Sequence, residues 1–200
     1  MNFLAHIYLS GNNEQITIGN FVADGIRGKK YIHYTDEIQI GILLHRERDT
    51  FTDAHPIFRR STKRLHKNYG HYSGVIVDIL YDHFLAKNWS HYSEIPLKDY
   101  INTFYNSLVA NIDTLPPRYK QMAPVMIEGN WLLSYATIEG IQSVLEGMNR
   151  RTKGRSKMNE ATKELKEHYK NFEIDFTEFF KELMEFTNTK RLQIKKQYNL

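Results

Sequence analysis

The chain has 200 residues, 41% of them apolar and 25% charged, which is ordinary for a globular protein and allows one domain with a substantial core. It contains no cysteine, so disulfides and thiolate metal sites are excluded, and any metal must be held by His, Asp or Glu. The net charge of +4 fits an acidic partner without requiring one, and no stretch approaches the apolar length of a membrane span. We therefore expect a single-domain cytoplasmic protein.

The first thirty residues predict a short apolar segment followed by a helix. Residues 2–9 (NFLAHIYL) are mostly apolar but include His6, and their periodicity does not distinguish a helix from a strand. Asn13 is a suitable N-cap for a helix running towards residue 25 or 28. Asp24 lies near the end of that helix, where the helix dipole disfavours a carboxylate unless Arg27 or a metal ion compensates its charge.

Residues 41–56 (GILLHRERDTFTDAHP) place His45, Asp49 and Asp53 at successive i, i+4 steps. On a helix each such step turns the side chain by about 40°, so the three head groups can lie along one stripe. Pro56 is expected to end this helix and to open the next one at its first position.

Residues 75–85 (VIVDILYDHFL) repeat this arrangement with Asp78 and Asp82, and His83 follows directly. The β-branched run is compatible with a strand, but the pattern continues without a break to Lys87, which is too long for an average strand. We therefore predict a second helix that carries carboxylates among apolar residues.

The rest of the chain predicts further helices and no strand pair. A short basic helix covers residues 57–67, and a strongly amphipathic core helix starts at Pro96 and reaches about residue 112. Shorter helices separated near Gly129 follow, and then a basic, glycine-containing loop at residues 150–157. Two last helices are expected, with a break around residues 172–175. The predicted fold class is all-α, a single-domain helical bundle.

The acids and histidines of these helices allow two interpretations. A lone acid on an apolar helix face is usually paired with Arg or Lys, and His6 is more often a hydrogen-bonded core histidine than a ligand. Several acids that converge on one core repel one another unless a cation lies among them, and a divalent metal is the simplest such cation. The two basic segments are most simply solvated surface; alternatively they bind an anion.

Five blocks of the sequence follow one another in a recognisable order: NFLAH (2–6), GNFVAD (19–24), GILLHRERDTFTDAHP (41–56), DILYDHFL (78–85) and GIQSVLEGMNRR (140–151). Together they closely resemble the acyl-carrier-protein phosphodiesterases, which are similar in turn to the all-α HD-type phosphohydrolases. The resemblance extends from residue 2 to about residue 155 and is weakest over the last forty residues.

The resemblance implies an enzyme that hydrolyses the phosphodiester joining 4′-phosphopantetheine to a serine of holo-acyl carrier protein. It also implies a divalent metal, with Mn²⁺ favoured and Mg²⁺ or Fe²⁺ as alternatives. The metal ligands that it implies are His6, Asp24, His45, Asp49, Asp53, Asp78 and Asp82. The residues that it implies for catalysis are Asp24, His45, Asp49, Asp82 and His83, with His83 or His6 as the acid that assists the leaving serine oxygen.

Basic residues are expected to contact the substrate. Arg27 or Arg151 would bind the phosphate, because the guanidinium fork matches its oxygens. The carrier protein is acidic, and the basic helix is expected to dock it through Arg59, Arg60, Lys63 and Arg64.

Two other functions are compatible with the sequence. One is a metal phosphohydrolase that acts on a nucleotide or another small phosphodiester with the same ligands. The other is a non-enzymatic helical binding protein whose acids pair with its Arg and Lys. A nucleic-acid partner is poorly supported, because the charge is modest and no groove-reading motif occurs. The sequence does not determine the oligomeric state.

Overall fold

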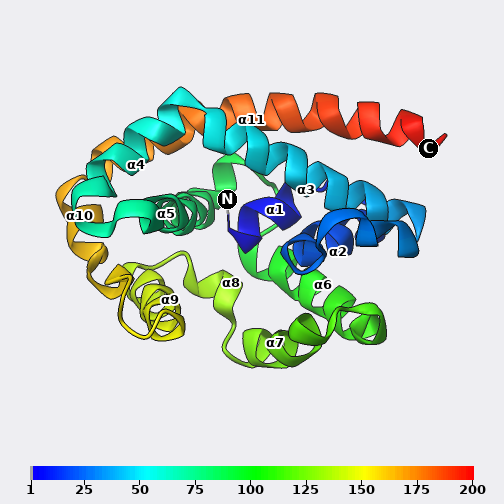
Figure 1. Cartoon of the computed structure of the whole chain (residues 1–200), viewed down its shortest axis with the longest axis horizontal. Coiled ribbons are helices and arrows are strands. Elements are labelled where there is room, and N and C mark those ends of the chain that lie inside the picture. Colours follow the sequence, from blue (N-terminus) through cyan, green and yellow to red (C-terminus); the bar gives the residue numbers. More distant parts are fainter. Residues whose placement is uncertain (1) are drawn as a thin grey trace.

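Residues 2–200, which the computed structural model describes, form helices joined by short turns and contain no strand (Figure 1). The α-helices in this range are α1 Phe3–Tyr8, α2 Glu14–Val22, α3 Asp36–Ala54, α4 Pro56–Tyr69, α5 Ser73–Lys87, α6 Leu97–Ala110, α7 Pro117–Glu128, α8 Trp131–Ser134, α9 Ile138–Arg151, α10 Thr162–Glu167 and α11 Tyr169–Gln197. The predicted all-α fold is confirmed. Within the described range, no helix has both the length and the apolar character needed to cross a bilayer.

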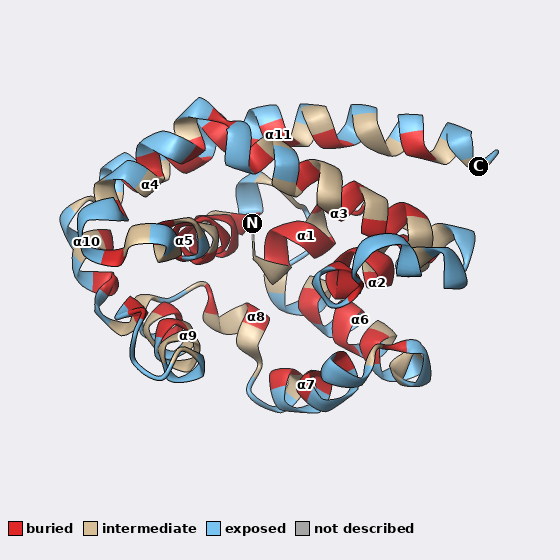
Figure 2. Cartoon of the chain, viewed as in Figure 1, coloured by how far each residue is buried: buried red, intermediate tan, exposed pale blue. Residues whose placement is uncertain are grey.

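Helix α5 lies in the middle of the core and is buried on almost every side (Figure 2). This explains why its sequence is apolar without a clear stripe: a helix surrounded by other helices needs apolar residues all round. The helix extends to Lys87, as the length of the pattern predicted. The adjoining helices α3 and α4 meet at Pro56, which is the first residue of α4, also as predicted.

Two glycines bring α2 and α3 into backbone contact. A Cβ atom at Gly19 would lie 2.2 Å from the Ile38 carbonyl oxygen, and one at Gly41 would lie 2.1 Å from the Ile16 carbonyl oxygen. No larger residue fits at either position without moving the helices apart. This close packing fixes the position of the C-terminal end of α2 relative to α3. Asp24 follows in the 3₁₀ turn η1 Ala23–Gly25, which lies beside the middle of α3.

The predicted break at residues 172–175 is wrong. The chain turns at His168, between α10 and α11, and α11 then runs unbroken to Gln197, beside α3 for part of its length (Figure 1). Phe172, Phe176 and Phe180 recur every fourth residue and are all fully buried. This spacing keeps one apolar face of α11 on the core, so the helix continues through the segment.

Candidate active site

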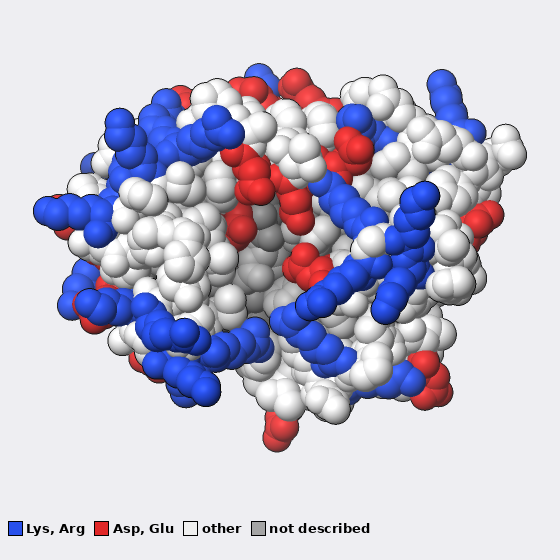
Figure 3. Space-filling view, in the orientation of Figure 1, with Lys and Arg blue, Asp and Glu red and all other residues white. Residues whose placement is uncertain are grey.

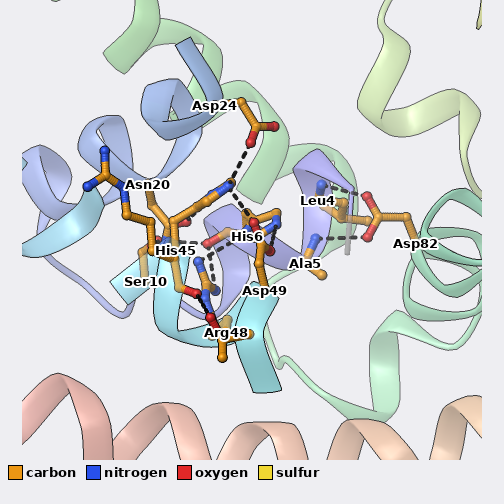
Figure 4. Close-up of polar contacts among 12 residues, drawn as sticks. Leu4, Ala5, His6, Ser10, Asn20, Asp24, His45, Arg48, Asp49 and Asp82 are labelled. Carbon is orange, nitrogen blue, oxygen red and sulfur yellow. Dashed lines mark hydrogen bonds and ion pairs between the residues drawn. The ribbon is translucent and has the colours of Figure 1, made fainter. Parts of the chain in front are cut away.

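Four polar side chains from three parts of the chain meet at one point (Figure 4). His45 Nε2 of α3 lies 3.1 Å from Asp24 Oδ1 of η1 and 3.0 Å from Asp49 Oδ2, one turn further along α3. His6 of α1 stacks on His45 with ring centroids 4.0 Å apart, and its Nε2 lies 3.5 Å from Asp49 Oδ1. The i, i+4 stripe predicted on α3 therefore holds for His45 and Asp49, and tertiary packing adds Asp24 and His6.

A chain of hydrogen bonds fixes which nitrogen of His45 carries a proton. The Ser10 hydroxyl donates to the His6 carbonyl oxygen, so its own oxygen accepts from the Asn20 side-chain NH₂. This orients the Asn20 amide with Oδ1 towards His45 Nδ1, at 3.3 Å. Because a carbonyl oxygen only accepts, His45 Nδ1 is the donor. The neutral ring therefore presents a lone pair at Nε2, where the two carboxylates converge.

The convergence of acceptors at His45 Nε2 requires a cation. Two carboxylate oxygens and an imidazole lone pair face one another, and only a proton or a metal ion between them removes the repulsion. With a proton there, burial lowers the pKa of His45, but the hydrogen bonds with Asp24 and Asp49 outweigh it and the pKa lies above its usual value. The hydrogen bond with His45 lowers the pKa of Asp24.

The donor set suits a divalent metal. Among the described residues, ligand atoms of His6, His45 and Asp49 all lie within 4.8 Å of one another, and Asp24 contacts the same nitrogen of His45. Imidazole nitrogens combined with carboxylate oxygens are suitable ligands for Mn²⁺, Fe²⁺ and Zn²⁺. A His45 ring oriented by an amide carbonyl is the usual arrangement behind a metal-binding histidine.

His6 is held differently from His45. The buried Arg48 guanidinium donates to His6 Nδ1 at 2.9 Å and to the His6 carbonyl oxygen at 3.2 Å. An arginine only donates, so Nδ1 accepts and the proton of a neutral ring lies on Nε2. The His6 ring in this arrangement directs an N–H towards Asp49, whereas His45 presents a lone pair. Lone pairs for a metal therefore come from His45, Asp49 and Asp24, and His6, which was predicted as a ligand, lies beside them as a hydrogen-bond donor.

A cavity of about 570 Å³ opens beside this cluster. Its polar lining includes His6, Asn20, Asp24, His45 and Asp78, and helices α8 and α9 form the opposite wall. Figure 3 shows a hollow at the centre of this face, with acidic side chains along its upper edge and basic side chains below it on both sides. The arginines that line the cavity are Arg118, Arg150 and Arg151.

Asp78 and Asp53 belong to the surroundings of this cluster. Asp78 of α5 lines the cavity, and burial raises the pKa of its carboxyl group; the charges of Asp49 and Asp53 raise it further. Asp53 is exposed near the end of α3. Asp78 therefore lies in the lining of the same cavity as His45, and the carboxylates that contact His45 Nε2 are those of Asp24 and Asp49.

Asp82 and His83 were predicted to lie at the site. In the structure their side chains instead form hydrogen bonds that hold other parts of the chain in place. Asp82 is fully buried and accepts the backbone N–H groups of Leu4, at 2.8 Å, and Ala5, at 3.1 Å, so it caps the start of α1 (Figure 4). His83 Nδ1 donates to the Tyr135 carbonyl oxygen, and its Nε2 lies 2.8 Å from the Tyr169 hydroxyl. Both His83 nitrogens are thereby occupied, and burial lowers the pKa of the ring.

The predicted docking residues are also partly occupied within the chain. Arg60 pairs with Asp175 and Glu178 of α11, and Arg64 pairs with the same Asp175 carboxylate. These ion pairs join α4 to α11, and docking of a partner by the basic helix stays a prediction. Arg59 and Lys63 are exposed on α4. Of the two arginines predicted to bind phosphate, Arg151 lines the cavity and the exposed Arg27 does not.

Replacing Asp175 by asparagine is expected to lower the free energy of unfolding by about 1–3 kcal/mol, because Arg60, Arg64 and Ser61 lose a buried anionic acceptor. Burial alone would raise the pKa of Asp175, but these three donors outweigh it and lower the pKa. The stabilisation is therefore present above the ordinary carboxyl pKa of about 4 and is lost as the pH falls through the lower folded-state value.

Urea unfolding of the Asp175 variant at pH 7 and at acid pH measures both effects. Glu178→Gln is the matched control, because this partly exposed partner of Arg60 is expected to change stability by less than about 1 kcal/mol. Equal losses in the two variants would contradict the buried role of Asp175.

Several residues of the site were not predicted from the sequence. Asn20 and Arg48 lie inside two of the motif blocks, in the same blocks as Asp24 and Asp49, but their types suggested no ligand. Their partners, His45 and His6, are distant in sequence, so only the fold reveals the contacts. Arg150 begins the basic loop that was predicted most simply to be solvated surface, and no role was predicted for Arg118; both line the cavity.

Comparisons with known proteins point to the same family over nearly the whole chain. The family described as acyl carrier protein phosphodiesterase matches residues 1–183. Curated proteins named acyl carrier protein phosphodiesterase from Pectobacterium atrosepticum and Klebsiella pneumoniae are each 30% identical, covering 96% of this chain and 100% of theirs. The one from Photorhabdus laumondii is 30% identical over 95% of this chain and 96% of its own. No solved structure matches the chain, so the expected likeness to HD-type phosphohydrolases stays a prediction.

Proposed function

The chain belongs to the acyl carrier protein phosphodiesterase family, and we propose that it hydrolyses the phosphodiester between 4′-phosphopantetheine and a serine of holo-acyl carrier protein. The products are apo-acyl carrier protein and 4′-phosphopantetheine. The observation that carries the proposal is the convergence of Asp24 and Asp49 on His45 Nε2 beside a cavity rimmed by arginines. A phosphodiester is an anion, and its hydrolysis needs both a cation and an activated water molecule.

A divalent metal, with Mn²⁺ preferred, is held in this proposal by His45, Asp49 and Asp24. When bound, such an ion lowers the pKa of its water and polarises the phosphoryl group. Asn20 keeps the His45 lone pair directed at the carboxylates by accepting from Nδ1. Arg48 orients the His6 ring, whose Nε2–H serves as a hydrogen-bond donor at the edge of the cluster.

Residues around the cavity bind the phosphate and protonate the leaving oxygen. Arg118, Arg150 and Arg151 line it and neutralise the phosphate oxygens. Asp78 lines the cavity too, and burial raises the pKa of its carboxyl group, which favours the protonated form that a general acid needs. In this proposal Asp78 is assigned the protonation of the departing serine oxygen, the role that the sequence suggested for His83 or His6.

Mass spectrometry of holo-acyl carrier protein incubated with this protein and Mn²⁺ tests the proposal. The expected result is conversion to the apo form, lost when a chelator is added. If holo-acyl carrier protein stays intact while a nucleotide or another small phosphodiester is hydrolysed, the substrate assignment is wrong. If the metal-loaded protein hydrolyses none of these, the catalytic proposal fails as a whole.

Mn²⁺ is expected to raise the thermal unfolding temperature, because a ligand bound only by the native state adds about 2.7 kcal/mol at a concentration of 100 Kd. The apparent affinity should fall as the pH is lowered through the raised pKa of His45, since the ion and the proton compete for Nε2. His45→Gln should abolish the shift, whereas the exposed control His33→Gln should keep it. A full shift in His45→Gln would place the metal elsewhere.

A further inference from the structure

The cavity beside the metal cluster has two chemically different walls. Helices α1, α2 and α3 supply the histidines and the amide, together with Asp24 of η1. Helices α8 and α9 lie on the other side (Figure 1) and supply apolar side chains together with serines and arginines. Trp131, Val144 and Met148 line this second wall and are each partly exposed. A phosphate group and its ion need the His–Asp cluster and the arginines, so the part of the 570 Å³ cavity beside Trp131, Val144 and Met148 is available to another part of the substrate.

Two glycines of α9 line this wall for different reasons. A Cβ atom at Gly140 would lie 1.9 Å from the Ser134 carbonyl oxygen, so close packing of α8 on α9 requires a glycine there. A Cβ atom at Gly147 would meet nothing nearer than Arg150 Nη2, at 3.7 Å. Glycine inside a helix costs about 1 kcal/mol relative to alanine, and packing does not account for it at Gly147. What the missing side chain provides is open space in the cavity.

We propose that the α8–α9 wall, formed by Trp131, Val144, Gly147 and Met148, is the binding site for the pantetheine arm of the prosthetic group. This inference rests on the proposed function. The arm continues directly from the phosphate, so a site for it must adjoin the phosphate site, as this wall adjoins Arg150 and Arg151. The arm carries a dimethyl carbon and methylene units that can cover apolar side chains on binding.

The polar groups of the same wall fit the rest of the arm. Its two amides and its hydroxyl need hydrogen-bond partners in a partly enclosed cavity. Ser134 and Ser143 line the cavity; their hydroxyls donate to backbone carbonyl oxygens of their own helices and can still accept from the N–H and O–H groups of the arm. A wall that combines apolar surface with a few hydroxyl groups suits an amphipathic chain.

The inference is tested by filling the space at Gly147 with a side chain and measuring ligand affinities. Isothermal titration of the Mn²⁺-loaded protein compares 4′-phosphopantetheine with inorganic phosphate, so the ratio of affinities isolates the contribution of the arm. We expect wild-type protein to bind 4′-phosphopantetheine at least about tenfold more tightly than phosphate. Gly147→Leu should bring this ratio close to one, with the loss falling mainly on 4′-phosphopantetheine, and Gly147→Ala should have a smaller effect.

The matched control is Gly74→Leu on α5. A Cβ atom at Gly74 also meets nothing within 4 Å, but Gly74 does not line the cavity, so the ratio should stay at the wild-type value. Thermal unfolding should show that both leucine variants are folded. A wild-type ratio near one, or a ratio unchanged in Gly147→Leu, overturns the inference.

Failure of this inference is distinguishable from failure of the proposed function. If wild-type protein and Gly147→Leu convert holo-acyl carrier protein at the same rate and bind 4′-phosphopantetheine equally well, only the arm site is wrong. If wild-type protein converts no holo-acyl carrier protein, the function is wrong, and the affinity ratio still decides whether the wall binds pantetheine.

Discussion

Replacing Asp49 by asparagine is expected to lower kcat for holo-acyl carrier protein by about 10²–10³-fold, with a parallel loss of bound metal. The two Asp49 oxygens contact different histidines, Oδ2 at 3.0 Å from His45 and Oδ1 at 3.5 Å from His6. The variant keeps the shape of the side chain but removes the negative charge. Steady-state kinetics at saturating Mn²⁺ and elemental analysis of the purified protein measure the two effects.

Glu47→Gln is the control for this prediction. Glu47 lies on the same helix two residues earlier and pairs with Lys190 of α11, away from the cluster. Its replacement is expected to leave kcat and metal content within about twofold of wild type, because a partly exposed ion pair contributes little. If the Asp49→Asn variant has full metal content and at least a tenth of wild-type activity, Asp49 is not part of the metal site.

Replacing Asp82 by alanine is expected to lower the free energy of unfolding by about 2–4 kcal/mol. The change leaves the buried N–H groups of Leu4 and Ala5 without their acceptor and loosens α1 from α5. Activity should fall as well, because α1 carries His6. Urea denaturation gives the stability, and the midpoint should move while the slope stays close to that of wild type.

Two further variants separate this capping role from metal binding. Asp82→Asn retains one acceptor oxygen and should lose less stability than Asp82→Ala, and the exposed Asp113→Ala should lose almost none. If Asp82→Ala unfolds like wild type but no longer binds Mn²⁺, then Asp82 is a metal ligand and the capping role is wrong.

Asp82 is also expected to make the stability of the protein depend on pH. Burial raises the pKa of Asp82 to about 7 in the folded protein, although the N–H groups of Leu4 and Ala5 oppose this shift. Between the ordinary carboxyl pKa of about 4 and that value, the folded state holds the proton more tightly than the unfolded state. Asp82 should therefore make the protein less stable as the pH rises through this range, and Asp82→Asn should lack that contribution.

Much of the fold was predictable from local patterns. The period of the apolar residues identified the amphipathic helix α6, the length of the apolar pattern identified α5, and Pro56 marked the boundary between α3 and α4, whereas residues 2–9 stayed undecided between helix and strand. The i, i+4 spacing placed His45 and Asp49 on one stripe before their contact was seen. These properties depend on neighbours within one helix, so the sequence by itself determined them.

Only the tertiary structure decided which polar groups meet. Asp82 and Asp78 belong to one helix and looked equivalent, yet Asp82 caps α1 while Asp78 lines the cavity. Asp24 reaches His45 because glycines let α2 and α3 pack backbone to backbone. Helical periodicity gives the face on which a side chain lies but not the helix that packs against that face. A buried carboxylate therefore becomes a cap, an ion-pair partner or a ligand according to the donors that packing brings to it.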